Sequence, residues 1–111
     1  MIQQGEDVVA VPSQVTGTSY TPSRTDSGRV IETSNGSAVT VTLGPCSSIG
    51  WHVGTLLQVF QQGEGQVTIA PGSGVTLRSN GNKYKTAAQY SVINLRMRAS
   101  DEWVVWGDTT V

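Results

Sequence analysis

The chain has 111 residues, a length that suits a single domain, and its seven Lys and Arg residues nearly balance its eight Asp and Glu residues. The net charge of −1 gives no basic field, so we expect neither nucleic acid nor a membrane as a partner. The single cysteine, Cys46, cannot form an internal disulfide, and no second thiol exists for a metal site. Hydrophobic residues make up a modest 37%, which favours a small core that gains stability from association with other copies.

The beginning of the chain differs from the rest. Residues 3–7 are polar, Pro12 cannot donate a ladder hydrogen bond, and Gly17 loosens the segment that follows. We therefore predict an extended N-terminal arm over residues 1–19 and a β-sandwich domain over residues 20–111. Because the N-terminus lacks the charged and apolar regions of a secretory signal, we expect synthesis and assembly in a cytoplasm.

The arm contains a short apolar run, residues 8–11, between polar flanks. Such a run is suited to adding a strand to a neighbouring protein, where main-chain hydrogen bonds give affinity and side chains fill shallow pockets. The candidate contacts with a neighbouring protein or another subunit in this run are Val8, Val9 and Val11.

Short β-branched or apolar segments follow, separated every few residues by Gly, Asn, Asp, Pro or Ser. The alternation of residues 39–43 predicts a half-buried strand. Residues 55–60 carry apolar side chains on both faces, as a central strand between two layers does. Residues 67–69 and 75–77 alternate again, and because turn residues 71–74 separate them, we predict an antiparallel hairpin.

The C-terminal third predicts the longest strand, Tyr90 to Arg98. Its apolar face includes Leu95, and its polar face presents Arg96 and Arg98. These two arginines could hold a neighbour's carboxylates through bidentate hydrogen bonds, or could be solvated charges. A turn leads into residues 103–106, which are apolar on both faces, so we predict a closing hairpin.

These patterns indicate an all-β protein. We predict an antiparallel β-sandwich or a jelly-roll-like barrel, because turn signals recur at the spacing typical of such folds. The one weak helical candidate is residues 85–89. The large residues that we expect in the core or at a trimer interface are Trp51, Phe60, Tyr90, Leu95, Trp103 and Trp106. Aromatic rings at the surface would instead form a stacking platform for a sugar.

Candidate catalytic groups are few. His52 is the only histidine, and no cysteine or carboxylate stands at ligand-like spacing beside it. Asp26, Ser27 and His52 could be assembled into a triad, yet no nucleophile elbow surrounds a serine. The Gly-x-Gly segments 63–65 and 72–74 lack the lysine of a phosphate loop and are interpreted as turns. We expect no enzyme activity, and predict no catalytic, cofactor-binding or metal-binding residues.

From Tyr20 onward, the order of features resembles a recurrent β domain of tailed-bacteriophage virion proteins, found in capsid decoration proteins and tail fibres. The resemblance covers about four-fifths of the chain. It implies a β-sandwich that commonly trimerises on a virion, and it carries no catalytic residues. The segments that carry it are residues 20–32, 38–43, 63–69, 74–79, 90–95 and 102–108.

The short arm and the absence of a repetitive shaft favour, within this resemblance, a decoration protein over a fibre. We therefore expect a trimeric capsid decoration (cement) protein on the capsid surface, with the major capsid protein and itself as partners and with no cofactor. Two alternatives stay open: a fibre or adaptor component that contacts the host or the tail, and a carbohydrate-binding module.

Overall fold

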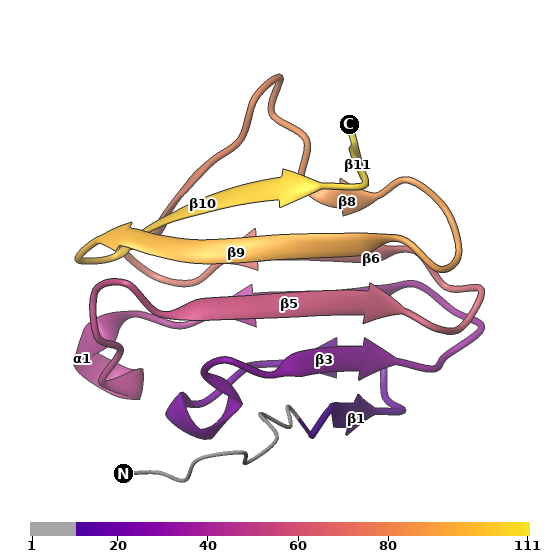
Figure 1. The fold of residues 1–111 in the computed structure, drawn as a ribbon, viewed down its shortest axis with the longest axis horizontal. Coiled ribbons are helices and arrows are strands. Elements are labelled where there is room, and N and C mark those ends of the chain that lie inside the picture. The colour runs from indigo at the N-terminus through magenta and orange to yellow at the C-terminus, as the bar shows by residue number, and fades with distance from the viewer. Residues whose placement is uncertain (1–10) are drawn as a thin grey trace, which may run out of the picture.

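The computed structural model describes residues 11–111 as two β-sheets packed face to face (Figure 1). The six-stranded sheet has the order β1-β3-β5-β9-β10-β7, and the five-stranded sheet has the order β11-β8-β6-β4-β2. The strands of the first are β1 (Ser13–Val15), β3 (Val30–Thr33), β5 (Leu56–Gln61), β7 (Thr76–Arg78), β9 (Val92–Ala99) and β10 (Glu102–Gly107). Those of the second are β2 (Ser19–Tyr20), β4 (Val39–Leu43), β6 (Val67–Pro71), β8 (Lys85–Thr86) and β11 (Thr109–Thr110).

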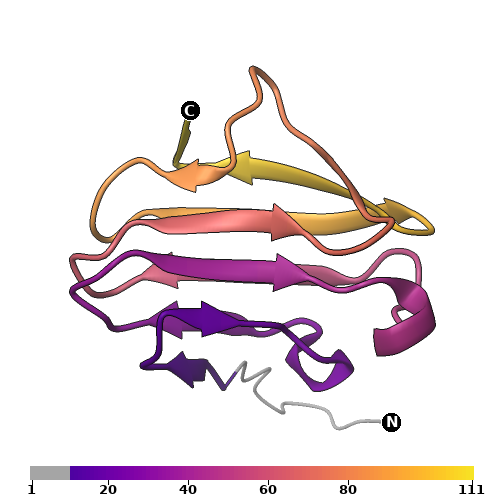
Figure 2. The ribbon, with the colours of Figure 1, turned by 180° about the vertical axis from the view of Figure 1, so that it is seen from behind.

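The first six strands wind as a coil between the two sheets. Odd strands β1, β3 and β5 lie parallel in one sheet, and even strands β2, β4 and β6 lie parallel in the other. Val30 pairs with Gln58, and Val39 pairs with Val67, so the step from the second coil to the third is 28 residues in both sheets. The coils are visible from both sides, as successive layers below β9 in Figure 1 and again in Figure 2.

The C-terminal strands complete both sheets, mostly through antiparallel pairs, whereas the first six strands form parallel pairs. β9 pairs antiparallel with β5, and β10 folds back antiparallel on β9, so the predicted closing hairpin is confirmed. β7 then lies parallel to β10 at the edge, while β8 joins β6 antiparallel. The predicted all-β sandwich is therefore confirmed, but its sheets are mixed in strand direction and not antiparallel throughout.

The predicted hairpin between residues 67–69 and 75–77 is wrong. β6 lies in the five-stranded sheet and β7 in the six-stranded sheet. The turn between them crosses from one sheet to the other, where the amide of Gly72 donates to the carbonyl of Leu43 on the preceding coil. Local turn chemistry is the same for a hairpin and for such a crossing, so the partner strand was misassigned.

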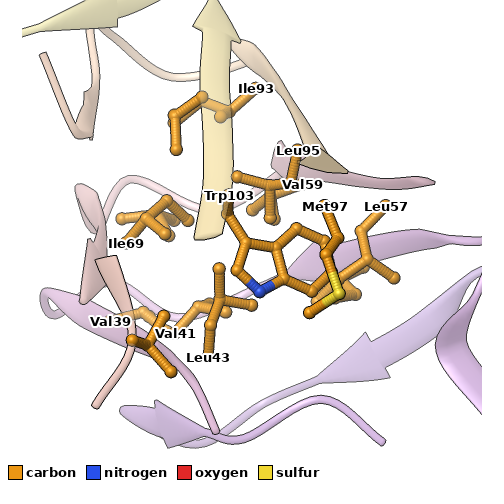
Figure 3. Close-up of a cluster of buried hydrophobic side chains, with 14 of the residues drawn as sticks. Val39, Val41, Leu43, Leu57, Val59, Ile69, Ile93, Leu95, Met97 and Trp103 are labelled. Carbon is orange, nitrogen blue, oxygen red and sulfur yellow. The ribbon is translucent and has the colours of Figure 1, made fainter. Parts of the chain in front are cut away.

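Buried side chains from both sheets meet in one core between them (Figure 3). The alternation of β4 and β9 is confirmed, since their inward residues are at most 1% exposed. Trp51 and Trp103 meet edge to face in this core, with ring centroids 5.2 Å apart and planes at 83°. Such aromatic pairs contribute about 0.5–1.5 kcal/mol beyond the area that they bury.

β5 is a central strand, but only one of its faces is buried. Leu57 and Val59 point into the core, whereas Leu56 is 51% exposed and Phe60 is half-buried. The prediction that residues 55–60 are buried on both faces is therefore wrong. Apolar residues stand on the outward side of this strand without a second layer over them.

The only α-helix in residues 11–111 is α1 (Cys46–Ile49), a single turn that connects β4 to β5. The helical candidate at residues 85–89 is wrong, because Lys85 and Thr86 form β8 and the hydroxyl of Thr86 accepts a hydrogen bond from the amide of Val67. A 3-10 turn, η1 (Arg24–Asp26), connects β2 to β3.

The predicted arm of residues 1–19 overlaps the sheets. Residues 13–15 form β1, which pairs with β3 in register from Ser13 to Val15, and Val15 is 5% exposed. The sandwich in this structure thus begins at Ser13. Residues 1–10, including Val8 and Val9, lie outside the described residues.

Candidate interaction face

The side of the six-stranded sheet that points away from the core forms a broad surface, which we call the outer face. Alternation along β3, β5, β9 and β10 turns every second residue outward. Three rows cross the strands on this face. The first row contains Glu32, Phe60 and Val92; the central row contains Val30, Gln58, Asn94 and Trp106; the third row contains Leu56, Arg96, Val104 and Arg78.

The central row joins amide side chains to an exposed indole ring. Gln58 Nε2 donates to Asn94 Oδ1 at 2.9 Å, and Asn94 pairs across strands with Trp106. A hollow of about 250 Å³ opens beside them. It is lined by Gly28, Arg29, Leu56, Leu57, Gln58, Asn94 and Trp106.

Large apolar side chains are exposed on and beside the outer face. Leu56 is 51% exposed, Trp106 is 45% exposed and Tyr90 is 63% exposed. Tyr90 stacks on Phe60 with ring centroids 6.2 Å apart. Grouped exposed apolar residues on a small domain mark a surface that contacts another molecule.

The outer face is basic at one end. Arg96 and Arg78 both lie in the third row, and Arg78 and Arg98 pair with Glu102, at 3.0 and 2.9 Å. Hydrogen bonding from Arg78, followed by that from Arg98, holds the pKa of Glu102 below its usual value. With Arg29 at the edge of the hollow, this end carries four arginines against one glutamate.

The opposite end of the outer face is acidic. Glu32 lies in the first row, where it accepts a hydrogen bond of 2.8 Å from Gln14 on β1. Asp108 follows β10 at the same end of the strands, where its carboxylate accepts from the amide of Val92 at 3.0 Å. The negative and positive side chains of the outer face are therefore separated along the strand direction.

The outward side of the five-stranded sheet has a different character. Its central row is built from Ser19, Thr40, Thr68, Lys85 and Thr110, which are cross-strand neighbours. These side chains are small or polar. Among the exposed large apolar residues of the described chain, Leu56, Tyr90 and Trp106 lie on or beside the outer face, whereas Val11, Val53 and Val111 lie outside the strands.

A buried carboxylate ties the first strands to the body. Asp26 is 3% exposed and accepts hydrogen bonds from the Ser13 hydroxyl, the Tyr20 hydroxyl and the Ser23 amide. Burial alone would raise the pKa of Asp26, but these hydrogen bonds outweigh burial and lower it. Burial and the adjacent Asp26 raise the pKa of Tyr20 to about 12. We assign this cluster a structural role, because it connects β1, β2 and η1.

The predicted core and trimer-packing residues divide into two groups. Trp51, Leu95 and Trp103 are buried in the core, with exposures of 6%, 0% and 0%. Phe60, Tyr90 and Trp106 lie instead on or beside the outer face. Of the predicted interaction residues, Val11 is 56% exposed, Arg96 is exposed and Arg98 pairs with Glu102.

Most members of this surface were not predicted from the sequence, including Leu56, Gln58 and Asn94 around the hollow. The alternation of residues 56–61 could have identified them, because Leu56 and Gln58 point to the opposite face of the strand from Leu57 and Val59. On β9, Asn94 and Arg96 likewise point to the same face of the strand. Recognising β5 and β9 as neighbours would have placed these residues together.

The candidate triad does not assemble into a buried site. His52 is exposed and its Nε2 lies 3.0 Å from Arg24 Nη2, which must be the donor because guanidinium has no acceptor. Asp26 is used by the cluster with Ser13 and Tyr20. Within residues 11–111, His, Cys, Asp and Glu side chains do not gather in groups of three or more that could hold a metal.

Comparisons of the chain with protein-family models, with curated proteins and with solved structures find no match in any of the three. In the part of the chain that the structure describes, no helix has both the length and the apolar character needed to cross a membrane.

Proposed function

We propose that this protein is a non-enzymatic structural component of a bacteriophage virion. In this proposal it is a trimeric capsid decoration protein that bridges and stabilises major capsid protein subunits. It is made in the host cytoplasm and lies on the capsid surface.

The outer face is the observation that carries the proposal. A domain of this size gains most from burying the exposed side chains of Leu56, Tyr90 and Trp106 against another protein. The cement role itself comes from the order of β segments that resembles phage virion domains. A second support is the two-sheet body packed around one core, because a bridging protein must hold its contacts at fixed positions.

The experiment is to count the protein in purified particles of the phage whose genome encodes it, by quantitative mass spectrometry and cryo-electron microscopy. A decoration protein is expected in hundreds of copies on the capsid lattice, at positions that contact the major capsid protein. Tens of copies or fewer on the tail would favour the fibre or adaptor role instead. Absence from the particle would contradict both.

The hollow beside Trp106 favours one further candidate, a carbohydrate-binding module. An exposed indole next to the Gln58 and Asn94 amides offers both ring stacking and neutral hydrogen bonding to a sugar. Binding of soluble oligosaccharides to the full chain, followed by NMR or calorimetry, tests this candidate. Loss of binding in Trp106→Ala with an unchanged melting temperature would support it.

A further inference from the structure

We infer that the outer face binds the same face of a second copy, in a two-fold contact whose axis runs along the central row of Val30, Gln58, Asn94 and Trp106. This inference rests on the proposed function only in treating the outer face as an assembly surface. The two-fold contact is separate from the three-fold contact of the proposed trimer. In a lattice of trimers it would join copies of adjacent trimers.

The arrangement of charge is the first argument. A two-fold rotation about the central row places the first row of one copy opposite the third row of the other. The acidic end, with Glu32 and Asp108, then faces the basic end, with Arg29, Arg78 and Arg96. Opposite charges therefore predominate at both ends of the contact, because the basic end carries four arginines against the single Glu102.

A three-fold arrangement of the same faces gives the opposite result. If the strands run parallel to a three-fold axis, residues at the same level along that axis come together from the three copies. Arg96 would then approach the arginines of its own row in the neighbouring copies, and Glu32 would have no cation at its height. Charge therefore favours the two-fold contact on this face, because juxtaposed like charges destabilise an interface.

The uncharged groups are self-complementary as well. On the axis, Gln58 and Asn94 would meet their own counterparts, and primary amides can do so because each both donates and accepts hydrogen bonds. Trp106 would meet Trp106 of the second copy, and offset ring stacking suits that contact. Off the axis, Phe60 on β5 would lie opposite Leu56 on β5 of the second copy, so apolar groups would cover one another.

The size of the face limits the strength of the contact. Six strands at about 4.8 Å spacing and about 20 Å of strand length give a flat area of roughly 500 Å². Stable interfaces bury about 800 Å² on each partner. We therefore expect a reversible dimer with a dissociation constant on the order of micromolar or weaker in solution, strengthened when copies are held together on a particle.

The test uses charge reversal at a pair that this geometry places face to face. Glu32 of one copy lies opposite Gly28 of the other, next to Arg29, whose side chain lines the hollow, and each such pair occurs twice. In Glu32→Arg, cations would meet cations, and in Arg29→Glu, anions would meet anions. Each variant alone is therefore expected to weaken self-association roughly tenfold or more, as measured by sedimentation velocity over a concentration series.

Mixing the two variants gives the decisive measurement. Every cross-contact between Glu32→Arg and Arg29→Glu joins opposite charges, so the mixture should form heterodimers at concentrations where each variant alone forms few homodimers. Raising the salt concentration should weaken both the wild-type dimer and the heterodimer. The matched control is Glu64→Arg, an exposed reversal in the turn after β5, which should dimerise like wild type. Melting temperatures establish that every variant is folded.

Three results would overturn the inference. The first is wild-type protein that stays monomeric at several hundred micromolar. The second is a mixture of the two variants that associates no better than each variant alone. The third is wild-type self-association, of monomers or of trimers, whose strength Glu32→Arg and Trp106→Ala leave unchanged. That third result would keep the proposed trimer intact, whereas absence from virions would remove the proposed function and leave the dimer standing.

Discussion

The Tyr20 hydroxyl donates a hydrogen bond of 2.7 Å to the Asp26 carboxylate, which joins the edge strand β2 to the 3-10 turn η1. Ser13 on β1 donates to the other oxygen of the same carboxylate. Two edge strands, one in each sheet, are thus fastened at one buried charge. The first two predictions follow from this cluster.

Asp26→Asn is expected to destabilise the fold by about 2–3 kcal/mol at neutral pH, because hydrogen bonds to a buried charge are lost. The folded pKa of Asp26 is lower than its ordinary value of 3.8. Its stabilisation is therefore present above about pH 3.8 and is lost as the pH falls through the lower folded pKa. Urea unfolding of both proteins from pH 7 downward should show the gap narrowing in acid. A constant gap would contradict this assignment.

Tyr20→Phe should change how the free energy of unfolding depends on pH in alkaline solution. The pKa of Tyr20 is raised from 10.0 to about 12 in the folded protein, so folding favours its neutral form. That contribution is complete below pH 10.0 and is lost as the pH rises toward about 12. Wild type should lose stability across this interval more steeply than Tyr20→Phe. Parallel curves for the two proteins would show that Tyr20 ionises freely.

Trp103→Ala and Trp106→Ala should differ sharply although the two residues share β10. Trp103 is fully buried against Trp51, and its removal should cost about 3–5 kcal/mol. Trp106 is 45% exposed on the outer face, and its removal should cost about 1 kcal/mol or less in the monomer. Denaturant unfolding at low protein concentration measures both values. Equal losses would mean that the outward position of Trp106 is wrong.

Gly65→Ala should destabilise the coil stack by about 3 kcal/mol. A Cβ at Gly65 would stand 1.8 Å from the carbonyl oxygen of Ser37, and the Gly65 amide donates to Asn35 on the same preceding coil. Backbone segments of adjacent coils approach too closely there for a side chain. Gly17→Ala is the matched control, since a Cβ at Gly17 meets no atom within 4 Å. A melting temperature unchanged by Gly65→Ala would contradict this packing.

Two N-terminal truncations test where the sandwich begins. Removing residues 2–15 deletes β1, including buried Val15 and the Ser13 hydrogen bond to Asp26, whereas removing residues 2–12 keeps all three. The longer deletion should therefore be less stable than the shorter one by about 2–4 kcal/mol. Thermal unfolding followed by circular dichroism compares them. Equal stability of the two truncated proteins would mean that residues 13–15 belong to the N-terminal arm and not to the sandwich.

Sequence alone predicted the elements whose burial follows a strict period of two. The alternation of residues 39–43 and the apolar parity of β9 identify inward residues directly, because side chains on a strand point alternately to the two faces. The adjacent β9 and β10 were also predicted, since a short turn between two strands leaves few choices of partner.

Pairing between distant segments could not be predicted in this way. The parallel partners Val39 and Val67 are separated by 28 residues, and nothing in either segment specifies the other. Leu56 and Phe60 show a second limit, because an apolar residue on the outward face of a strand looks the same in sequence as one buried in the core. The outer face was missed for that reason, although Trp106 and Arg96 had been singled out.

The parallel coils also determine how the molecule would yield to tension. β1 and β2 form the outermost coil, and each sheet is entered at that edge by one short strand (Figures 1 and 2). A force applied at the N-terminal side would peel this coil first, and then the coil of β3 and β4, because each coil is held mainly by its neighbour. A coil step of 28 residues releases roughly 95 Å of extended chain. Under load, the protein should therefore lengthen in successive steps while the β9–β10 hairpin at the far side stays paired.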